Sequence, residues 1–320
     1  MPRAIVVPPA QAESQFAEDV AYYLSLTPRQ LPSRYLYDQL GSALFDAICL
    51  LPWYRITRVE RDLLRLHANE VFVRLPGLKT LVELGPGNGE KLAALVEAEA
   101  RGPVTAHLVD VSPHALEAAI RTLHQSRELS VVAHQATYEA GLVTAMRARE
   151  AGGPALVVFL GSNIGNFDRP GADAFVRGAR AALGHGDAIL LGTDLVKPEP
   201  ELMLAYDDPL GVTAAFNKNL LARANRELGA DFDIDGFAHR AVWNEEMSRI
   251  EMHLVSRTRQ RVRVPAAGLD ITLQEGETIW TESSYKYRPA GVEMMLDRAG
   301  FATSDQWIAD GFTLTLAVAH

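Results

Sequence analysis

A short apolar run that leads into three closely spaced glycines constrains this chain most strongly. Residues 81–84 are apolar except for Glu83, and glycines follow at positions 85, 87 and 89. An apolar run of this length predicts a buried strand. Glycine tolerates positive φ angles and allows a ligand to approach the backbone closely. The sequence therefore predicts a strand that opens into a ligand-binding turn.

The spacing of these glycines is typical of one class of cofactor enzyme. Gly-x-Gly-x-Gly preceded by Glu83 is closer to the pattern of S-adenosylmethionine (SAM) enzymes than to the Gly-x-Gly-x-x-Gly of dinucleotide enzymes. Asp110 ends the next apolar run, where a carboxylate can accept hydrogen bonds from both ribose hydroxyls. Lys91 either pairs with the cofactor carboxylate or faces solvent. Gly85, Gly87, Lys91 and Asp110 are thus the first candidate SAM ligands.

Composition excludes several other functions. Of 320 residues, 48% are hydrophobic and 22% charged, with a net charge of -9, so we expect no binding to nucleic acid. No apolar run reaches the roughly 20 residues that cross a bilayer, and the apolar patch near the N-terminus is too short for a secretory segment. Cys49 is the only cysteine. We expect a cytoplasmic monomer without a metal or a membrane partner.

The pattern along the chain predicts two domains. Apolar runs alternate with helical patterns between residues 59 and 196, as a parallel α/β sheet requires. One helix of this series is expected near residues 142–151. Residues 250–264 instead alternate like antiparallel strands. We predict a class I SAM-dependent methyltransferase sheet (Rossmann-like) from 59–196 plus 286–320, and an α+β substrate-binding domain from 1–58 plus 197–285.

Two loops complete the candidate site. After the third strand, where methyltransferases often carry an acid that accepts from the adenine amino group, the chain has Thr137 and Tyr138. We assign Thr137 as a single acceptor and Tyr138 as a neighbour of the adenine ring. After the fourth strand, the segment with Gly161 and Asn166 combines glycines with amide side chains. The carboxyl ends of central strands face the ligand crevice in open α/β sheets, which favours a reaction loop.

Taken together, these stretches resemble the histidine Nα-methyltransferases of ergothioneine biosynthesis, which form hercynine, the trimethyl betaine of histidine. The matching stretches span nearly the whole chain in the family's order. They are residues 35–42, 51–54, 81–91, 159–166, 191–197, 205–208, 211–217, 249–252 and 281–284.

The resemblance implies a role for each matching residue. Asn166 and Tyr206 match positions that bind the histidine carboxylate, and Tyr54 and Tyr37 match positions around the α-amine, where either tyrosine can relay a proton. Glu282 and Ser284 match the pair that reads the imidazole. Other matching positions line the pocket; they are Phe45, Gly161, Thr213 and Met252. Thr137 departs from the family, which typically has an acid there.

The chemistry of the imidazole supports this hypothesis. A carboxylate beside a hydroxyl can accept from one ring nitrogen and hydrogen-bond the other. An indole or phenol would leave Glu282 without a proper partner, at a cost of about 1–3 kcal/mol. Three alternatives stay open: a relative that methylates tryptophan, a nicotinamide-dependent oxidoreductase, and a SAM-binding module without catalysis. The sequence shows no evident hydride-transfer constellation for the second.

Overall fold

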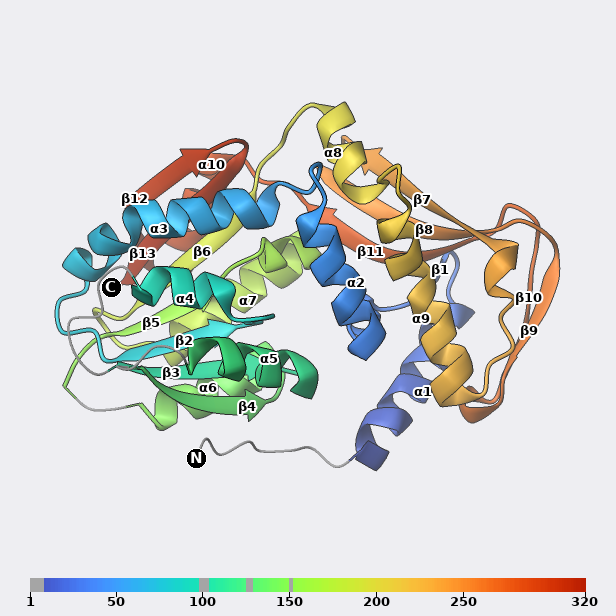
Figure 1. Cartoon of the computed structure of the whole chain (residues 1–320), viewed down its shortest axis with the longest axis horizontal. Coiled ribbons are helices and arrows are strands. Elements are labelled where there is room, and N and C mark those ends of the chain that lie inside the picture. The colour runs from blue at the N-terminus through green and yellow to red at the C-terminus, as the bar shows by residue number, and fades with distance from the viewer. Residues whose placement is uncertain (1–8, 98–103, 125–128, 150–151) are drawn as a thin grey trace. The chain divides into compact units, whose positions relative to one another are not determined.

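Two units divide the chain in the computed structural model (Figure 1), which describes residues 9–97, 104–124, 129–149 and 152–320. The first unit is built from the described residues of Ile56–Val196 together with Lys286–His320. The second contains the described residues up to Arg55 and the segment Lys197–Tyr285. Each unit has its own sheet and its own buried apolar side chains.

The first unit is built on a seven-stranded sheet with the order β12-β13-β6-β5-β2-β3-β4. The strands are β2 (Thr80–Leu84), β3 (Val104–Asp110), β4 (Leu129–Gln135), β5 (Ala155–Phe159), β6 (Ala188–Asp194), β12 (Phe301–Ala309) and β13 (Phe312–Ala319). Strands β2 to β6 are parallel to one another, whereas β13 is antiparallel to β6 and to β12. Chain order reverses between β2 and β5, the switch point where such sheets bind ligands.

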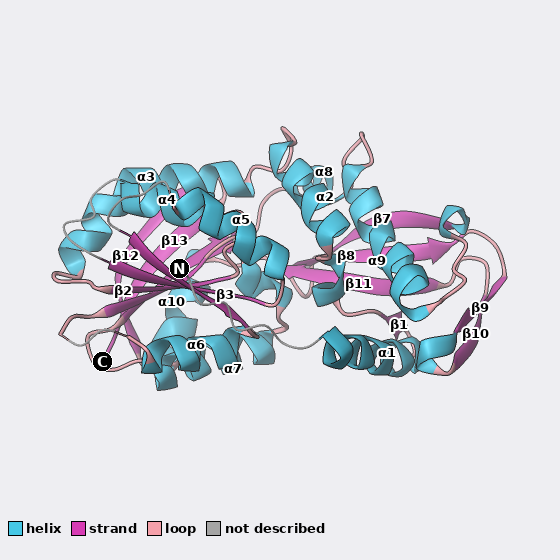
Figure 2. Cartoon of the chain, turned by 60° about the horizontal axis from the view of Figure 1, so that its bottom comes forward, coloured by secondary structure: helices cyan, strands magenta, loops and turns pink. Residues whose placement is uncertain are grey.

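Helices cover both faces of this sheet (Figure 2), so the central strands β2, β5 and β6 are buried throughout. Helices α3 (Ile56–Arg74), α4 (Glu90–Glu97) and α5 (Pro113–Leu123) lie on one face. Helices α6 (Tyr138–Arg147), α7 (Arg169–Ala182) and α10 (Pro289–Arg298) lie on the other. In the part of the chain that the structure describes, no helix has the length and apolarity of a membrane span.

The second unit has a four-stranded sheet with the order β1-β11-β8-β7 and a separate β9–β10 hairpin. Its strands are β1 (Arg29–Gln30), β7 (Phe237–Asn244), β8 (Arg249–Ser256), β9 (Gln260–Val264), β10 (Leu269–Leu273) and β11 (Thr278–Tyr285). Helices α8 (Glu199–Tyr206) and α9 (Val212–Leu228) pack on β7 and β8. Helix α2 (Gln39–Leu50) packs on α9, and α1 (Pro9–Ser25) contacts β1.

The structure corrects one predicted element and confirms another. The helix expected near residues 142–151 is α6, which begins four residues earlier, at Tyr138, because Thr137 caps it: the Thr137 hydroxyl accepts from Ala140 N–H at 3.4 Å. The predicted end of this helix, Ala151, lies outside the described residues. The alternating run 250–264 is confirmed as antiparallel strands: its first part lies in β8, and its second part, β9, pairs with β10.

Candidate functional site

The glycine turn after β2 is the meeting point of three segments of the first unit. Gly85 has φ +73° and donates from its N–H to the carbonyl of Val109 at 2.8 Å, which ties the ends of β2 and β3 together. A Cβ atom on Gly85 would lie 2.8 Å from Asn163 Nδ2 and 3.0 Å from the Tyr138 hydroxyl. Gly87 has φ +55° and open space around it. Gly85 therefore allows Asn163 and Tyr138 to approach the backbone closely, whereas Gly87 allows the positive φ angle of the turn.

A buried acid that the sequence analysis did not select connects two of the candidate residues. The carboxylate of Glu60, on α3, pairs with Lys91 Nζ at 2.8 Å. It also accepts from the N–H of Gly161 at 2.8 and 2.9 Å. The side chain of Glu60 is 0% exposed, whereas that of Lys91 is 22% exposed. One carboxylate, that of Glu60, thus holds both Lys91, a predicted cofactor ligand, and Gly161, at the start of the predicted reaction loop.

The sheet makes room for this acid. A Cβ atom on Gly192, in β6, would lie 2.0 Å from Glu60 Oε1, so a larger residue there would displace this carboxylate. One sequence signal points to Glu60: it lies on the apolar face of the predicted helix, among the buried residues Val59, Leu63 and Leu64. A charged side chain on a core-facing stripe needs a partner, because unpaired buried charge is strongly unfavourable.

Two further acids lie close to this turn and have raised pKa values. Burial raises the pKa of Glu83 to about 8, since the nearby Lys91 charge only partly offsets desolvation and the charges of Glu60 and Asp110. Burial also raises the pKa of Asp110 to about 6, although the backbone N–H groups of Ser112 and Val111 favour its carboxylate. Near pH 7, Glu83 is therefore mostly protonated and Asp110 is mostly ionised.

Thr137 and Tyr138 begin helix α6, next to the glycine turn. The Thr137 hydroxyl caps the helix and its side chain is exposed. The Tyr138 ring instead contacts Phe159 at a centroid distance of 5.2 Å, and its hydroxyl points to Gly85. Tyr138 therefore lies beside the turn, while Thr137 lies at its rim.

The reaction loop after β5 has a fixed backbone. Gly161 and Ser162 both adopt left-handed angles, with φ values of +74° and +57°. The strained Ser162 is held because its hydroxyl accepts from the N–H of Asp194 at 2.9 Å. The Asp194 carboxylate in turn pairs with Lys286 at 2.8 Å, and both side chains are at most 1% exposed. The loop continues into a short 3-10 helix, η2 (Asn163–Asn166), which ends at the exposed Asn166.

In the second unit, four predicted substrate residues belong to one chain of aromatic contacts. Tyr37 contacts Phe45 with ring centroids 5.6 Å apart, Phe45 contacts Tyr54 at 6.0 Å, and Tyr54 contacts Tyr206 at 6.4 Å. Phe216, which the sequence analysis did not select, contacts Tyr37 at 5.5 Å and Phe45 at 5.9 Å. The structure thus groups these residues from α2, α8, α9 and the loops beside them.

The other predicted substrate residues of the second unit lie on neighbouring elements. The hydroxyl of Tyr206 lies 2.8 Å from that of Ser284, within hydrogen-bonding distance. Glu282 and the buried Met252 are direct partners across β11 and β8. Thr213 is buried in the first turn of α9, where its N–H donates to Asp208 at 2.7 Å.

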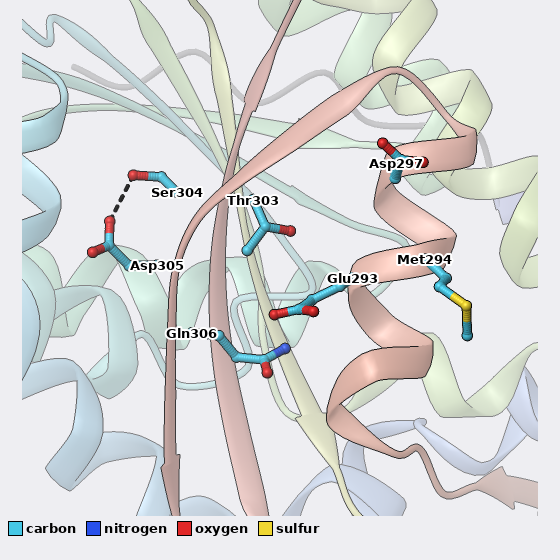
Figure 3. A pocket seen from close by; sticks show the side chains of 7 residues that line it. All are labelled: Glu293, Met294, Asp297, Thr303, Ser304, Asp305 and Gln306. Atoms are coloured by element: carbon cyan, nitrogen blue, oxygen red, sulfur yellow. Dashed lines mark hydrogen bonds between the residues drawn. The ribbon is translucent and has the colours of Figure 1, made fainter.

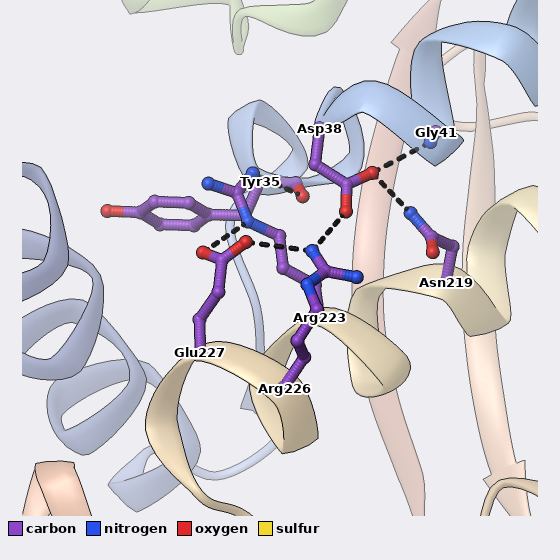
Figure 4. A network of polar contacts seen from close by, with 7 residues as sticks. All are labelled: Tyr35, Asp38, Gly41, Asn219, Arg223, Arg226 and Glu227. Atoms are coloured by element: carbon purple, nitrogen blue, oxygen red, sulfur yellow. Dashed lines mark hydrogen bonds and ion pairs between the residues drawn. The ribbon is translucent and has the colours of Figure 1, made fainter. Parts of the chain in front are cut away.

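A polar network supports the segment that carries Tyr37 (Figure 4). Asp38 caps α2 by accepting from Gly41 N–H at 2.7 Å, and it also binds Asn219 at 2.7 Å and Arg226 at 2.6 Å. These partners hold the pKa of Asp38 below its ordinary value, even though burial opposes them. Because Asn219 and Arg226 lie on α9, the network fastens the start of α2 to that helix.

A polar hollow on the first unit lies apart from these residues. Its volume is about 490 Å³ and its lining comes from α10 and β12 (Figure 3). Three of its polar lining residues already have partners: Ser304 donates to Asp305 at 2.6 Å, Arg74 binds the same carboxylate, and Gln306 donates to the carbonyl of Pro289. None of the predicted site residues lines this hollow.

Comparison with known proteins identifies the family of this chain. Residues 16–320 match the family described as histidine-specific methyltransferase, SAM-dependent. The chain belongs to this family. Membership identifies the sheet of the first unit as a class I methyltransferase sheet with SAM as methyl donor, and it excludes the nicotinamide alternative.

Relatives over most of the chain carry matching names. The histidine N-alpha-methyltransferase of Mycolicibacterium smegmatis is 41% identical over 314 residues, which cover 96% of this chain and 96% of that protein. That of Mycobacterium tuberculosis is 44% identical over 307 residues, which cover 93% of each. Ergothioneine biosynthesis protein 1 of Neurospora crassa is 28% identical over 270 residues, which cover 79% of this chain and 31% of that longer protein.

Glu60→Gln tests the link between the buried acid and the cofactor ligand. The amide keeps an acceptor for Gly161 N–H but loses the charge opposite Lys91, so we expect SAM affinity to fall about tenfold, equivalent to 1.4 kcal/mol. Isothermal calorimetry measures this directly. Asp187→Asn is the matched control, because Asp187 is also buried and accepts from the N–H of Ala155, at the opposite end of β5. SAM binding equally weakened in both variants would mean that Glu60 acts only through stability.

Asp110 predicts a pH dependence of SAM binding. Because its pKa is raised to about 6, the carboxylate is progressively protonated as the pH falls from 7 to 5. SAM affinity should therefore fall by about tenfold over this interval, since the acceptor for the ribose hydroxyls is lost. Asp110→Asn should bind SAM weakly with a flat profile. Glu83 titrates near 8 and His107 near 4, outside this window. Parallel profiles for the two proteins would remove Asp110 from the site.

Proposed function

We propose that this chain transfers methyl groups from SAM to the α-amino group of L-histidine, three times in succession, to form hercynine in the first step of ergothioneine biosynthesis. One observation carries this proposal. In the second unit, the two residues expected to bind the imidazole, Glu282 and Ser284 (the imidazole pair), lie together with the aromatic residues. Tyr206 lies 2.8 Å from Ser284, and Glu282 is adjacent to Met252. Family membership and the named relatives support the reaction type and the substrate.

The first unit is proposed to hold SAM, which supplies a methyl group on a sulfonium ion. Gly85 and Gly87 would admit the methionine and ribose portions, and Asp110 would accept from the ribose hydroxyls. Lys91, held by Glu60, keeps ammonium protons for the cofactor carboxylate. Tyr138, beside the turn, is proposed to flank the adenine, and Thr137 is proposed to offer one hydroxyl acceptor at its rim.

The second unit is proposed to read the histidine side chain. Glu282 accepts from one ring N–H of the imidazole, while the Ser284 hydroxyl, itself oriented by Tyr206, bonds the other nitrogen. An indole has one N–H and no ring nitrogen that accepts, so it could make only one of these two contacts. This difference favours histidine over tryptophan.

Methyl transfer requires the amine as a neutral nucleophile. Its lone pair forms the new N–C bond while the C–S bond breaks, and one proton must leave the nitrogen for each methyl group. Tyr37 or Tyr54 is proposed to relay this proton, and their rings with Phe45 and Phe216 would stabilise the growing ammonium charge by cation–π contact. Asn166 and Tyr206 are proposed to hold the carboxylate, and Gly161, Thr213 and Met252 to line the pocket.

We further propose that the protein is a cytoplasmic monomer that acts on free histidine without a metal. The net charge of -9 supports a protein that binds neither nucleic acid nor an anionic membrane surface.

Incubation of the purified protein with SAM and each common amino acid tests the activity. We expect mono-, di- and trimethylhistidine by mass spectrometry, and little product from other amino acids. Faster methylation of tryptophan or tyrosine than of histidine would reject the specificity. Tight SAM binding without methylation of any amino acid would favour a non-catalytic module.

Glu282→Ala tests the imidazole contact. Removing the carboxylate should raise the KM for histidine at least about tenfold, because the ring N–H loses its acceptor, while the KM for SAM should change little. The matched control is Glu251→Gln: Glu251 precedes Met252 on β8, so its side chain lies on the opposite face of the same sheet. Equal changes in both KM values would assign Glu282 a structural role only.

A further inference from the structure

The pairing of β8 with β11 contains an irregularity immediately before the imidazole pair. Trp280 pairs with His253, and the next pair joins Glu282 to Met252. Two steps along β11 thus correspond to one step along β8, and Thr281 is the additional residue. This arrangement is a β-bulge.

The bulge decides which face of the sheet carries Glu282. Residues two apart on a regular strand share a face, so Trp280 and Glu282 would lie on the same face without it. Directly paired residues also share a face. Because Trp280 pairs with His253 and Glu282 with the neighbouring Met252, the bulge places the two β11 side chains on opposite faces. Glu282 thereby joins the face of the buried Met252.

The same shift places Ser284. It pairs with Ile250, which is buried on the face of Met252. On this face lies the hydroxyl of Tyr206, 2.8 Å from that of Ser284. In a regular strand, Ser284 would follow Trp280 and Glu282 onto the other face. One additional residue therefore positions both members of the imidazole pair.

Side chains on both sides hold the bulge in place. The hydroxyl of Thr281 is buried and donates to the carbonyl of Met252 at 3.0 Å. The indole N–H of Trp280 donates to the carbonyl of Glu282 at 2.9 Å. Arg249 lies over the Trp280 ring at 4.5 Å from its centroid. The two hydrogen bonds satisfy carbonyls on either side of the irregular pairing.

We propose that Thr281 is a positioning residue for substrate specificity: its hydrogen bond to Met252 fixes the bulge that presents Glu282 and Ser284 to the imidazole. This inference rests on the proposed function. In this role Thr281 does not contact the substrate itself. Trp280 supports the same bulge through its indole N–H.

The test compares Thr281→Val, which keeps the shape and removes the hydroxyl, with Thr281→Ser, which keeps the hydroxyl. Thr281→Val should raise the KM for histidine about tenfold and leave the KM for SAM within about twofold. Thr281→Ser should keep the histidine KM within about threefold of the wild type. Thr313→Val is the matched control, because Thr313 is also buried and donates to a carbonyl, that of Trp307, in the first unit.

The outcomes separate this inference from the proposed function. If the wild type does not methylate histidine, the proposed function fails. If the wild type does methylate histidine, two results would overturn the positioning role. One is a Thr281→Val variant with the wild-type KM for histidine. The other is a Thr281→Val variant that, like the Thr313→Val control, changes the KM values for histidine and SAM to the same extent. Trp280→Phe is an independent variant should Thr281→Val fold poorly. It removes the N–H that holds the Glu282 carbonyl, and an unchanged histidine KM in this variant would also overturn the proposal.

Discussion

The carboxylate of Glu60 is the contact on which the candidate cofactor site depends. A fully buried acid is tolerated only when charge and hydrogen bonds compensate its desolvation. Here the Lys91 ammonium and the Gly161 N–H supply both. The compensation has a structural consequence, because α4 and the loop after β5 must each keep one group directed at the same point on α3. Gly192, in β6, leaves the space that this carboxylate occupies.

The candidate residues of the second unit are held in place by contacts other than a buried ion pair. Its candidate residues are mostly aromatic or on strands, and their positions follow from ring contacts, the Asp38 network and the bulge in β11. Aromatic side chains have few rotatable bonds, so a chain of touching rings fixes several side chains together. The proposed recognition of histidine would need this rigidity, since a carboxylate and a hydroxyl would have to reach two nitrogens of one small ring. A displaced strand register would exchange the faces and remove both groups at once.

Much of the first unit could be predicted from sequence, because its signals are local. Continuous apolar runs identify buried parallel strands, and the glycines after β2 mark the turn. Glu60 was missed because its partner Gly161 is 101 positions away. The start of α6 was missed because Thr137 was interpreted only as a ligand contact, although threonine is also a common N-cap. The bulge was out of reach, since the residues of β11 acquire their register only through pairing with β8.

The charges around the glycine turn explain why Asp110 suits a ligand with hydroxyl donors. Glu60 is paired with Lys91, and Asp194 with Lys286. Glu83 carries a raised pKa and is mostly neutral near pH 7. Burial also raises the pKa of Asp110, but there the opposing influence comes from backbone N–H groups and not from a lysine. An ionised carboxylate that is desolvated but incompletely compensated gains from every further donor. The two hydroxyls of a ribose supply such donors, so binding of the cofactor would remove an unfavourable interaction that folding leaves in place.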